Sequence, residues 1–197
     1  MITFAGSDPG DLNYGYTILS ASNTRGKLRI KVLEIGMFSC QINNLTAKPA
    51  KPPKSKRRKT IKILYPPFPD QMDSFSTEWE EIFDSHKVVG YTTERFQARG
   101  LKGKSIEAVS IMNGLSCSLA RKRQIDFEMI TASTWKNQVN RYTDLEAIYA
   151  MVPDLTPHSI DSCFLAIHGV IRHFKSSWDD VPYGEVIKQL QCFETVK

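Results

Sequence analysis

The 197-residue sequence lacks a long apolar segment. No window approaches the roughly 18 unbroken apolar residues from which a membrane-spanning helix is predicted. The opening residues, Met1 to Phe4, lead to Asp8 without the basic and apolar stretches of a secretory signal. We therefore expect a cytoplasmic protein with no membrane partner.

Cysteine pairs at metal-binding or redox spacing are also missing. The four cysteines are widely separated, and none belongs to a CxxC or Cys/His pattern: Cys40, Cys117, Cys163 and Cys192. This spacing argues against a structural zinc site and a disulfide framework, and it favours a reduced, cytosolic setting.

Acidic residues are absent between Lys48 and Lys62, where eight basic residues are concentrated. Without them the chain carries 18 basic and 21 acidic residues, so the net charge of +5 comes from this segment. Its prolines favour an extended, flexible arm, and its charge suits a polyanionic partner. A solvated loop that only aids solubility is the alternative. The basic residues are Lys48, Lys51, Lys54, Lys56, Arg57, Arg58, Lys59 and Lys62.

Strand-like and helix-like patterns follow one another along the rest of the chain. Three strands come first, joined by a hairpin at residues 23–26, and helices and strands then alternate. This order predicts an α/β domain in which helices flank a central mixed sheet. The expected strands are 2–7, 14–22, 28–35, 88–93 and 127–131. The expected helices are 73–85, 105–121, a short one capped by Ser133, 145–152, one that Thr156 caps with Pro157 in its first turn, and a small C-terminal one after Ser177.

Four ionisable residues lie at the ends of these elements, where α/β proteins place their sites. Asp8 follows the first strand, Glu94 ends the fourth, and His158 and Asp161 share one face at the start of the last long helix. Carboxylates from distant segments are ligands suited to Mg²⁺, and paired ions of this kind cleave phosphodiesters. A turn signal at Asp8, a surface salt bridge of Glu94 and a favourable acid at a helix N-terminus remain as alternatives.

Three segments together carry a resemblance to the RuvC-type Holliday-junction resolvases. The first, FAGSDPG at 4–10 followed by Gly15 and Tyr16, resembles the family's first-strand motif. The second, TERF at 93–96, resembles the strand that delivers a glutamate. The third, TPHSIDSCFLAI at 156–167, is similar to the last motif, in which Asp or His precedes Asp by three residues at a helix start. The segments occur in the family's order within residues 1–175.

The resemblance implies a ribonuclease-H-like fold with a five-stranded mixed sheet, formed by residues 1–175 with the arm at 48–62 inside them and a C-terminal extension at 176–197. It also implies a structure-selective DNA endonuclease with two Mg²⁺ ions in each active site. Asp8 would lie between the ions, and Glu94 and Asp161 would bind from either side. His158 would serve as a ligand or handle the proton of the attacking water. Because imidazole suits Mn²⁺ better than Mg²⁺, we expect Mn²⁺ to substitute.

Family members act as homodimers that nick a four-way junction symmetrically, and the resemblance implies the same partners here. The helix at 105–121 is then a candidate dimer element, although its apolar stripe also suits a core. Phe96 is the candidate wedge into the junction centre. The candidate DNA-binding cations are Lys136, Arg95, Arg99, Lys102, Lys104 and, in the arm, Lys56, Arg57, Arg58 and Lys59.

The long basic arm departs from the bacterial pattern and suggests a bacteriophage-encoded relative that acts in the cytoplasm of a bacterial host cell. Such an enzyme would also cut forks or other branched DNA. Two alternatives remain: a ribonuclease H-type or less selective nuclease of the same superfold, and a non-catalytic protein that binds branched DNA. The acidic residues at every motif position argue against the second, because unneeded negative charge would repel DNA.

Overall fold

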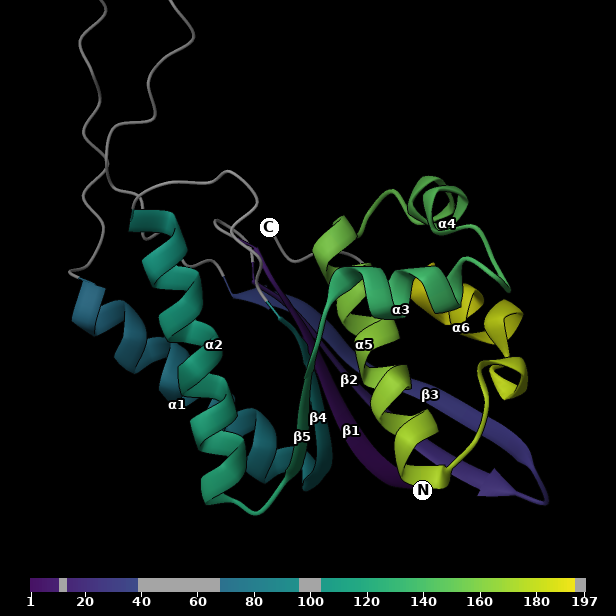
Figure 1. The fold of residues 1–197 in the computed structure, drawn as a ribbon, viewed down its shortest axis with the longest axis horizontal. Coiled ribbons are helices and arrows are strands. Elements are labelled where there is room, and N and C mark those ends of the chain that lie inside the picture. The colour runs from purple at the N-terminus through teal and green to yellow at the C-terminus, as the bar shows by residue number, and fades with distance from the viewer. Residues whose placement is uncertain (11–13, 39–67, 96–103, 194–197) are drawn as a thin grey trace, which may run out of the picture.

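The computed structural model describes residues 1–10, 14–38, 68–95 and 104–193 (Figure 1). The basic arm at 48–62 and Cys40 lie outside the described residues. Cys117, Cys163 and Cys192 are free thiols. No helix in the described part of the chain is both long and apolar enough to cross a membrane.

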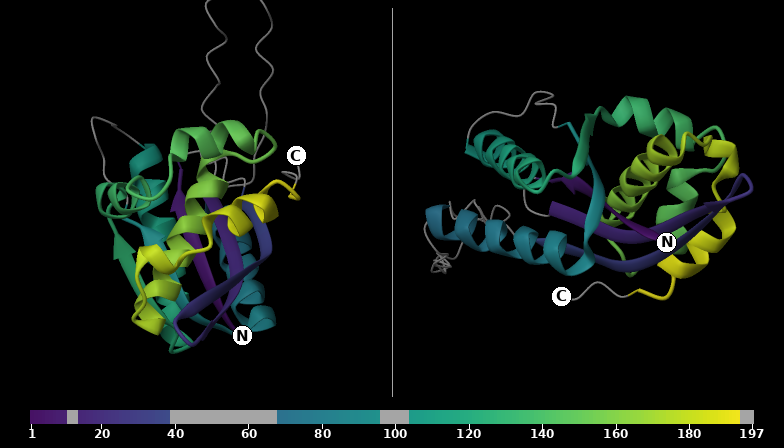
Figure 2. Two further views of the ribbon diagram at one scale, coloured as in Figure 1. Left: turned by 90° about the vertical axis from the view of Figure 1, so that its right-hand side faces the viewer. Right: turned by 90° about the horizontal axis from the view of Figure 1, so that it is seen from below.

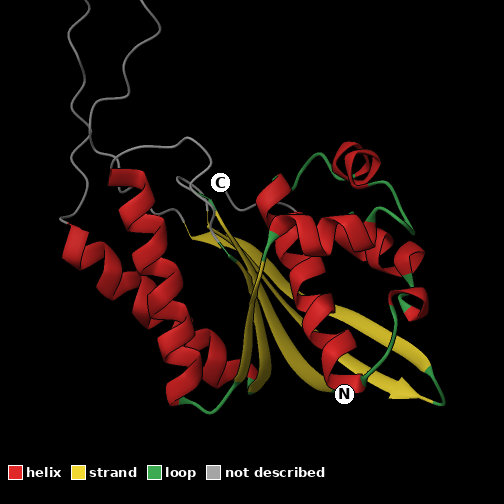
Figure 3. Cartoon of the chain, in the orientation of Figure 1, coloured by secondary structure: helices red, strands yellow, loops and turns green. Residues whose placement is uncertain are grey.

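A five-stranded mixed sheet forms the centre of the molecule, in the order β3-β2-β1-β4-β5 (Figure 3). β1 pairs with β2, and β2 with β3, in antiparallel fashion, whereas β4 runs parallel to both β1 and β5. The carboxyl ends of the neighbouring strands β1 and β4 therefore lie side by side at the same end of the sheet. The strands are β1 (Ile2–Pro9), β2 (Tyr14–Thr24), β3 (Lys27–Phe38), β4 (Val88–Glu94) and β5 (Asp126–Ile130).

Helices cover the sheet in two groups. α1 and α2 lie together on one side, and the remaining helices lie on the other (Figure 1). This arrangement confirms the predicted fold class, a mixed sheet flanked by helices. The described helices are α1 (Phe68–His86), α2 (Lys104–Lys122), α3 (Ala132–Val139), α4 (Leu145–Met151), α5 (Pro157–Phe174), the 3-10 helix η1 (Trp178–Asp180) and α6 (Tyr183–Leu190).

Two apolar clusters, one on each side of the sheet, form the core. Neighbouring residues of β1 divide between them, because side chains alternate along a strand: Phe4 joins α5 and Ala5 joins α1. η1 and α6 belong to the first cluster, to which they contribute Trp178, Val186 and Leu190. Residues 176–193 therefore pack against the same core as the preceding elements.

The β2–β3 hairpin turns through Arg25 and Gly26, both with positive φ, as a two-residue hairpin turn requires. At the other side of β3, the Gln189 side chain of α6 occupies the strand's open edge. Its Oε1 accepts the Val32 N–H at 2.8 Å, and its Nε2 donates to the Ile30 carbonyl at 3.0 Å. The amide thus satisfies two backbone groups that a further strand would otherwise pair with.

α5 crosses β1 and β2 at backbone contact. A Cβ on Gly6 of β1 would lie 2.1 Å from the Ser162 carbonyl oxygen, and one on Gly15 of β2 would lie 2.3 Å from that of His158. Only glycine permits so close an approach. These two residues therefore set the first turns of α5 directly over the end of the sheet.

Two sequence predictions about element boundaries at the site are wrong. Asp8 does not open a turn: β1 continues through it, since Asp8 pairs with Gly15 and Pro9 with Tyr14. Ser133 does not cap α3, which begins at Ala132 with Thr131 as the N-cap residue. Thr131 is still extended as it leaves β5, so the helix begins as soon as the strand ends.

Helix α1 also begins earlier than expected, at Phe68, with Pro69 in its first turn. Proline in the first turn disrupts no intrahelical hydrogen bond, so Pro69 is compatible with a helix that begins at Phe68. The expected cap of α5 is confirmed: the Thr156 hydroxyl accepts the Ser159 N–H, and Pro157 occupies the first turn.

Candidate active site

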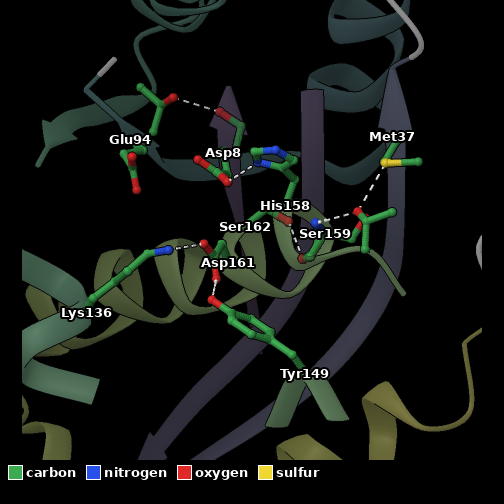
Figure 4. Close-up of polar contacts among 12 residues, drawn as sticks. Asp8, Met37, Glu94, Lys136, Tyr149, His158, Ser159, Asp161 and Ser162 are labelled. Atoms are coloured by element: carbon green, nitrogen blue, oxygen red, sulfur yellow. Dashed lines mark hydrogen bonds and ion pairs between the residues drawn. The ribbon is translucent and has the colours of Figure 1, made fainter. Parts of the chain in front are cut away.

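A cavity of about 560 Å³ opens where β1 and β4 end and α5 begins. β1 contributes Asp8, β4 contributes Glu94, and α5 contributes His158 and Asp161, so all four predicted catalytic residues line one site (Figure 4). The full lining is Asp8, Pro9, Glu94, Ala132, Lys136, Asn140, Leu145, Glu146, Tyr149, Pro157, His158 and Asp161.

Asp8 is nearly buried, with 5% of its surface exposed, and it contacts His158. Its Oδ2 lies 2.5 Å from His158 Nδ1. This hydrogen bond, opposed by burial, raises the pKa of the imidazole. The charged form of His158 is thus stabilised by Asp8, which orients the ring towards the cavity.

Asp161 is 3% exposed and accepts two side-chain hydrogen bonds. Lys136 Nζ of α3 lies 2.5 Å from its Oδ2, and the Tyr149 hydroxyl of α4 donates to its Oδ1 at 2.5 Å. Burial and the charge of Asp8 nevertheless raise the pKa of Asp161, although Lys136 and Tyr149 lower it. Burial is the largest of these effects, so the folded site disfavours the charged form of Asp161 even with both partners in place.

The charged form of Glu94 is disfavoured for the same two reasons. Burial and the charge of Asp8 raise the pKa of this carboxyl to about 7, against the hydrogen bond from Trp135 and the charge of Lys136. Trp135 of α3 donates its indole N–H to Glu94 Oε2 at 2.9 Å. A cation in the cavity would relieve this repulsion.

The donor set suits a hard divalent cation, since it combines three carboxylates with one imidazole at an open cavity. Among the residues that the structure describes, no group of three or more His, Cys, Asp or Glu side chains is arranged to hold a metal ion as it stands. Asp8 and Asp161 are instead turned to His158, Lys136 and Tyr149. Metal binding would therefore exchange these contacts for coordination.

Behind the carboxylates, a buried hydrogen-bond network ties β1 and β4 to α2. Ser7, next to Asp8, donates to Thr93, next to Glu94, at 2.8 Å. Asn113 of α2 accepts from the Thr93 hydroxyl at 3.0 Å and donates its Nδ2 to the Glu94 carbonyl at 2.9 Å. The network fixes the two strand ends relative to each other.

The predicted DNA-binding cations are only partly described. Lys136 lies in the site, and Arg95 is exposed directly after Glu94, with its N–H donating to the Ile130 carbonyl. Lys104 is the first residue of α2, and its side chain lies outside the described part. The remaining candidates also lie outside it: Phe96, Arg99, Lys102, Lys56, Arg57, Arg58 and Lys59.

The sequence did not single out Tyr149, Trp135 or Asn113 as site residues. Asn113 and Tyr149 sit in helices whose patterns indicate ordinary packing. Trp135 directly precedes Lys136, the residue of this segment that the resemblance pointed to. The buried residues of α4 are Leu145 and Ile148, and Tyr149 follows directly after them, next to the buried face of the helix. This position is the one sequence feature that could have pointed to Tyr149.

The similarity of this chain to known proteins is found in its structure and not in its sequence. No protein-family model matches the sequence, and no curated protein matches it. A structure of RuvC from Thermus thermophilus superposes with a TM-score of 0.62 at 13% identity, covering 89% of this chain and 98% of that one. The T. thermophilus RuvC complex with Holliday junction substrate gives 0.61 at 12%, with the same coverage.

The yeast mitochondrial Holliday junction resolvase Ydc2 has a TM-score of 0.52 at 14% identity, covering 94% of this chain and 82% of that one. The three alignments extend over most of both chains, so they concern the whole domain and not a shared substructure. The chain therefore has the ribonuclease-H-like α/β fold of RuvC.

Proposed function

We propose that this chain is a structure-selective DNA endonuclease that resolves four-way junctions by metal-dependent phosphodiester hydrolysis. The observation that carries the proposal is the convergence of Asp8, Glu94, His158 and Asp161 from β1, β4 and α5 on one cavity. The fold is that of Holliday junction resolvases, which supports the choice of substrate.

Asp8, Glu94 and Asp161 would hold two Mg²⁺ ions, or Mn²⁺ in their place, and His158 would act either as a further ligand in its neutral form or as the group that handles the proton of the attacking water. When bound, such ions supply Lewis-acid stabilisation of the phosphate and lower the pKa of a bound water. His158, whose charged form Asp8 stabilises, is placed to hold a proton at Nδ1. Lys136 supplies a positive charge at the cavity wall, where it would orient a scissile phosphate.

We further propose that the protein acts as a homodimer that makes paired, symmetric nicks. Helix α2 supports this part of the proposal, because Ile111 on its surface is 47% exposed. A second large apolar side chain, Met129 of the adjacent β5, is 42% exposed. Light scattering of the purified protein measures the dimer directly, and a monomer at assay concentration would contradict it.

The test of the activity is cleavage of a labelled four-way junction, a fork and a linear duplex, each in Mg²⁺ and in Mn²⁺. The Asp8→Asn variant removes one charge from the site, and Glu185→Gln, an exposed residue of α6, is the matched control. Binding of each variant to the junction is measured alongside in EDTA.

We expect symmetric junction nicks from the wild type and from Glu185→Gln, and none from Asp8→Asn, which should still bind. Equal cutting of all three substrates would indicate a less selective nuclease. Cutting of an RNA–DNA hybrid in preference to the junction would indicate a ribonuclease H-type enzyme. Binding without cutting in either metal would refute the enzymatic proposal.

A further inference from the structure

A stripe of exposed cations runs along the β2–β3 hairpin, away from the candidate active site. Lys27, Arg29 and Lys31 alternate along β3 with the buried Leu28, Ile30 and Val32. Side chains at every second position point to the same face of a strand. The three cations therefore share one face of β3, which we call the basic stripe.

The strand next to the basic stripe carries small polar side chains on the same face. Opposite the three cations, β2 places only small hydroxyl side chains: Ser20 faces Lys31, Ser22 faces Arg29 and Thr24 faces Lys27. In Figure 1 the hairpin points away from α1 and α2, the two helices that cover this side of the sheet elsewhere. A large partner that approaches the cations along β2 therefore meets small side chains at Ser22 and Thr24, whereas the exposed Met1 lies beside Ser20, with its Sδ 4.0 Å from the Ser20 Oγ.

Along the basic stripe, the β2–β3 hairpin carries no carboxylate that could neutralise it. Residues 14–33 include no Asp or Glu, and Arg25 in the turn adds a fourth exposed cation. None of the stripe residues forms a salt bridge within the described ranges. The first carboxylate along β3 is Glu34, which His86 contacts at 2.9 Å. The basic stripe thus ends before Glu34, where His86, the last residue of α1, contacts the strand.

We propose that the basic stripe binds the phosphate backbone of a duplex arm of the DNA substrate, outside the catalytic cavity. Alternate side chains on a strand are about 6.8 Å apart, so Lys27 to Lys31 span about 14 Å, or about four base-pair steps of B-DNA. The Ser22 and Thr24 hydroxyls add donors of the kind that contact phosphate oxygens. The assignment of the duplex as part of a branched substrate rests on the proposed function.

The location of the stripe gives this contact a distinct role. Figures 1 and 2 place the hairpin and the N-terminus at the end of the sheet opposite to α4, whereas α4 borders the cavity. DNA held at both places would lie along the length of the molecule. The stripe would then bind an arm without contacting the bond that is cut, and its effect should appear in affinity and not in the chemical step.

The test compares a triple variant, Lys27→Gln with Arg29→Gln and Lys31→Gln, with a control of equal charge change. The control replaces exposed cations elsewhere: Arg121→Gln, Lys122→Gln and Lys188→Gln. Binding of a labelled four-way junction is followed by fluorescence anisotropy in EDTA over a range of salt concentrations. Cleavage at saturating enzyme in Mg²⁺ is measured separately.

Each lost phosphate contact lowers the slope of log K against log salt by about 0.9, so three lower it by about 2.7. Raising the salt from 50 to 200 mM should therefore weaken junction binding by the control about 40-fold more than junction binding by the triple variant. Once the enzyme saturates the DNA, the triple variant should cleave at the wild-type rate. Equal slopes for both variants would overturn the proposal. A slope change in a protein that never cleaves DNA would uphold the stripe and refute the nuclease.

Discussion

Replacing Gly15 with alanine should leave the protein folded but greatly lower its rate of DNA cleavage. The new Cβ would lie 2.3 Å from the His158 carbonyl oxygen and 2.8 Å from the Ser159 nitrogen, both in the backbone of α5. An ordinary contact begins at 3.4 Å, so the start of α5 must move by about 1 Å. His158 and Asp161 move with it, whereas Asp8 remains on β1.

The two effects of this shift differ in size. Overpacking of this kind costs about 1–3 kcal/mol of folding free energy. For a domain of this length, that corresponds to a decrease in Tm of about 2–12 °C, which leaves the variant folded at assay temperature. A misplacement of about 1 Å between catalytic groups lowers the rate by about 100-fold.

The assay is single-turnover cleavage of the junction at saturating enzyme, with Tm from thermal denaturation. Gly184→Ala is the matched control: this exposed glycine of α6 has no neighbour within 4 Å of a new Cβ, so its Tm and rate should match or slightly exceed those of the wild type. Wild-type cleavage by Gly15→Ala would refute the reasoning. So would a rate loss that disappears once the unfolded fraction is removed.

Three further predictions concern charge and hydrogen bonding. Above pH 7, Glu94→Gln should raise the Tm of the metal-free protein, because burial and the charge of Asp8 disfavour the charged carboxyl of the wild type. Added Mg²⁺ should stabilise the wild type more than the variant. A Tm in EDTA that the substitution leaves unchanged would contradict this. Burial lowers the pKa of His168, so below about pH 6.5 the unfolded chain binds a proton that the folded chain does not, and stability falls as the pH falls. Urea denaturation at pH 7.5 and 5.5 should show a smaller loss for His168→Leu, whereas equal losses would exclude this histidine as the cause. Asn113→Leu should cost about 1–3 kcal/mol in the same urea titration, since the Glu94 carbonyl loses its side-chain donor and the Thr93 hydroxyl loses its acceptor, although Ser7 still donates to Thr93; an unchanged stability would contradict this.

The convergence of the four catalytic candidates could be predicted because local signals placed each one. Thr156 and Pro157 marked the start of α5, three residues or fewer from His158, and the strand pattern brought Glu94 to the end of β4. The parallel pairing of β1 and β4 then joins Asp8 and Glu94 at one edge. The order of the elements suggested a mixed sheet but did not say which strands are neighbours, so the ribonuclease-H-like fold, which the family resemblance implied, was needed to expect this pairing.

Other features of the site depend on tertiary contacts that leave no local pattern. Tyr149 and Trp135 are aromatic residues in short helices, a placement that equally suits a core, and only the packing of α3 and α4 against α5 directs them to the carboxylates. The extension of β1 through Asp8 was hidden because Asp-Pro-Gly is a strong turn signal. Pairing with β2 outweighs that signal.

The Gln189 amide at the edge of β3 has a consequence for the behaviour of the protein in concentrated solution. An open strand edge is a template on which another chain can add a strand, and this route leads to aggregation. Addition at β3 would first require the amide to leave both Val32 and Ile30. Gln189 therefore protects solubility at this edge, an effect that a measurement of folding stability alone would not detect.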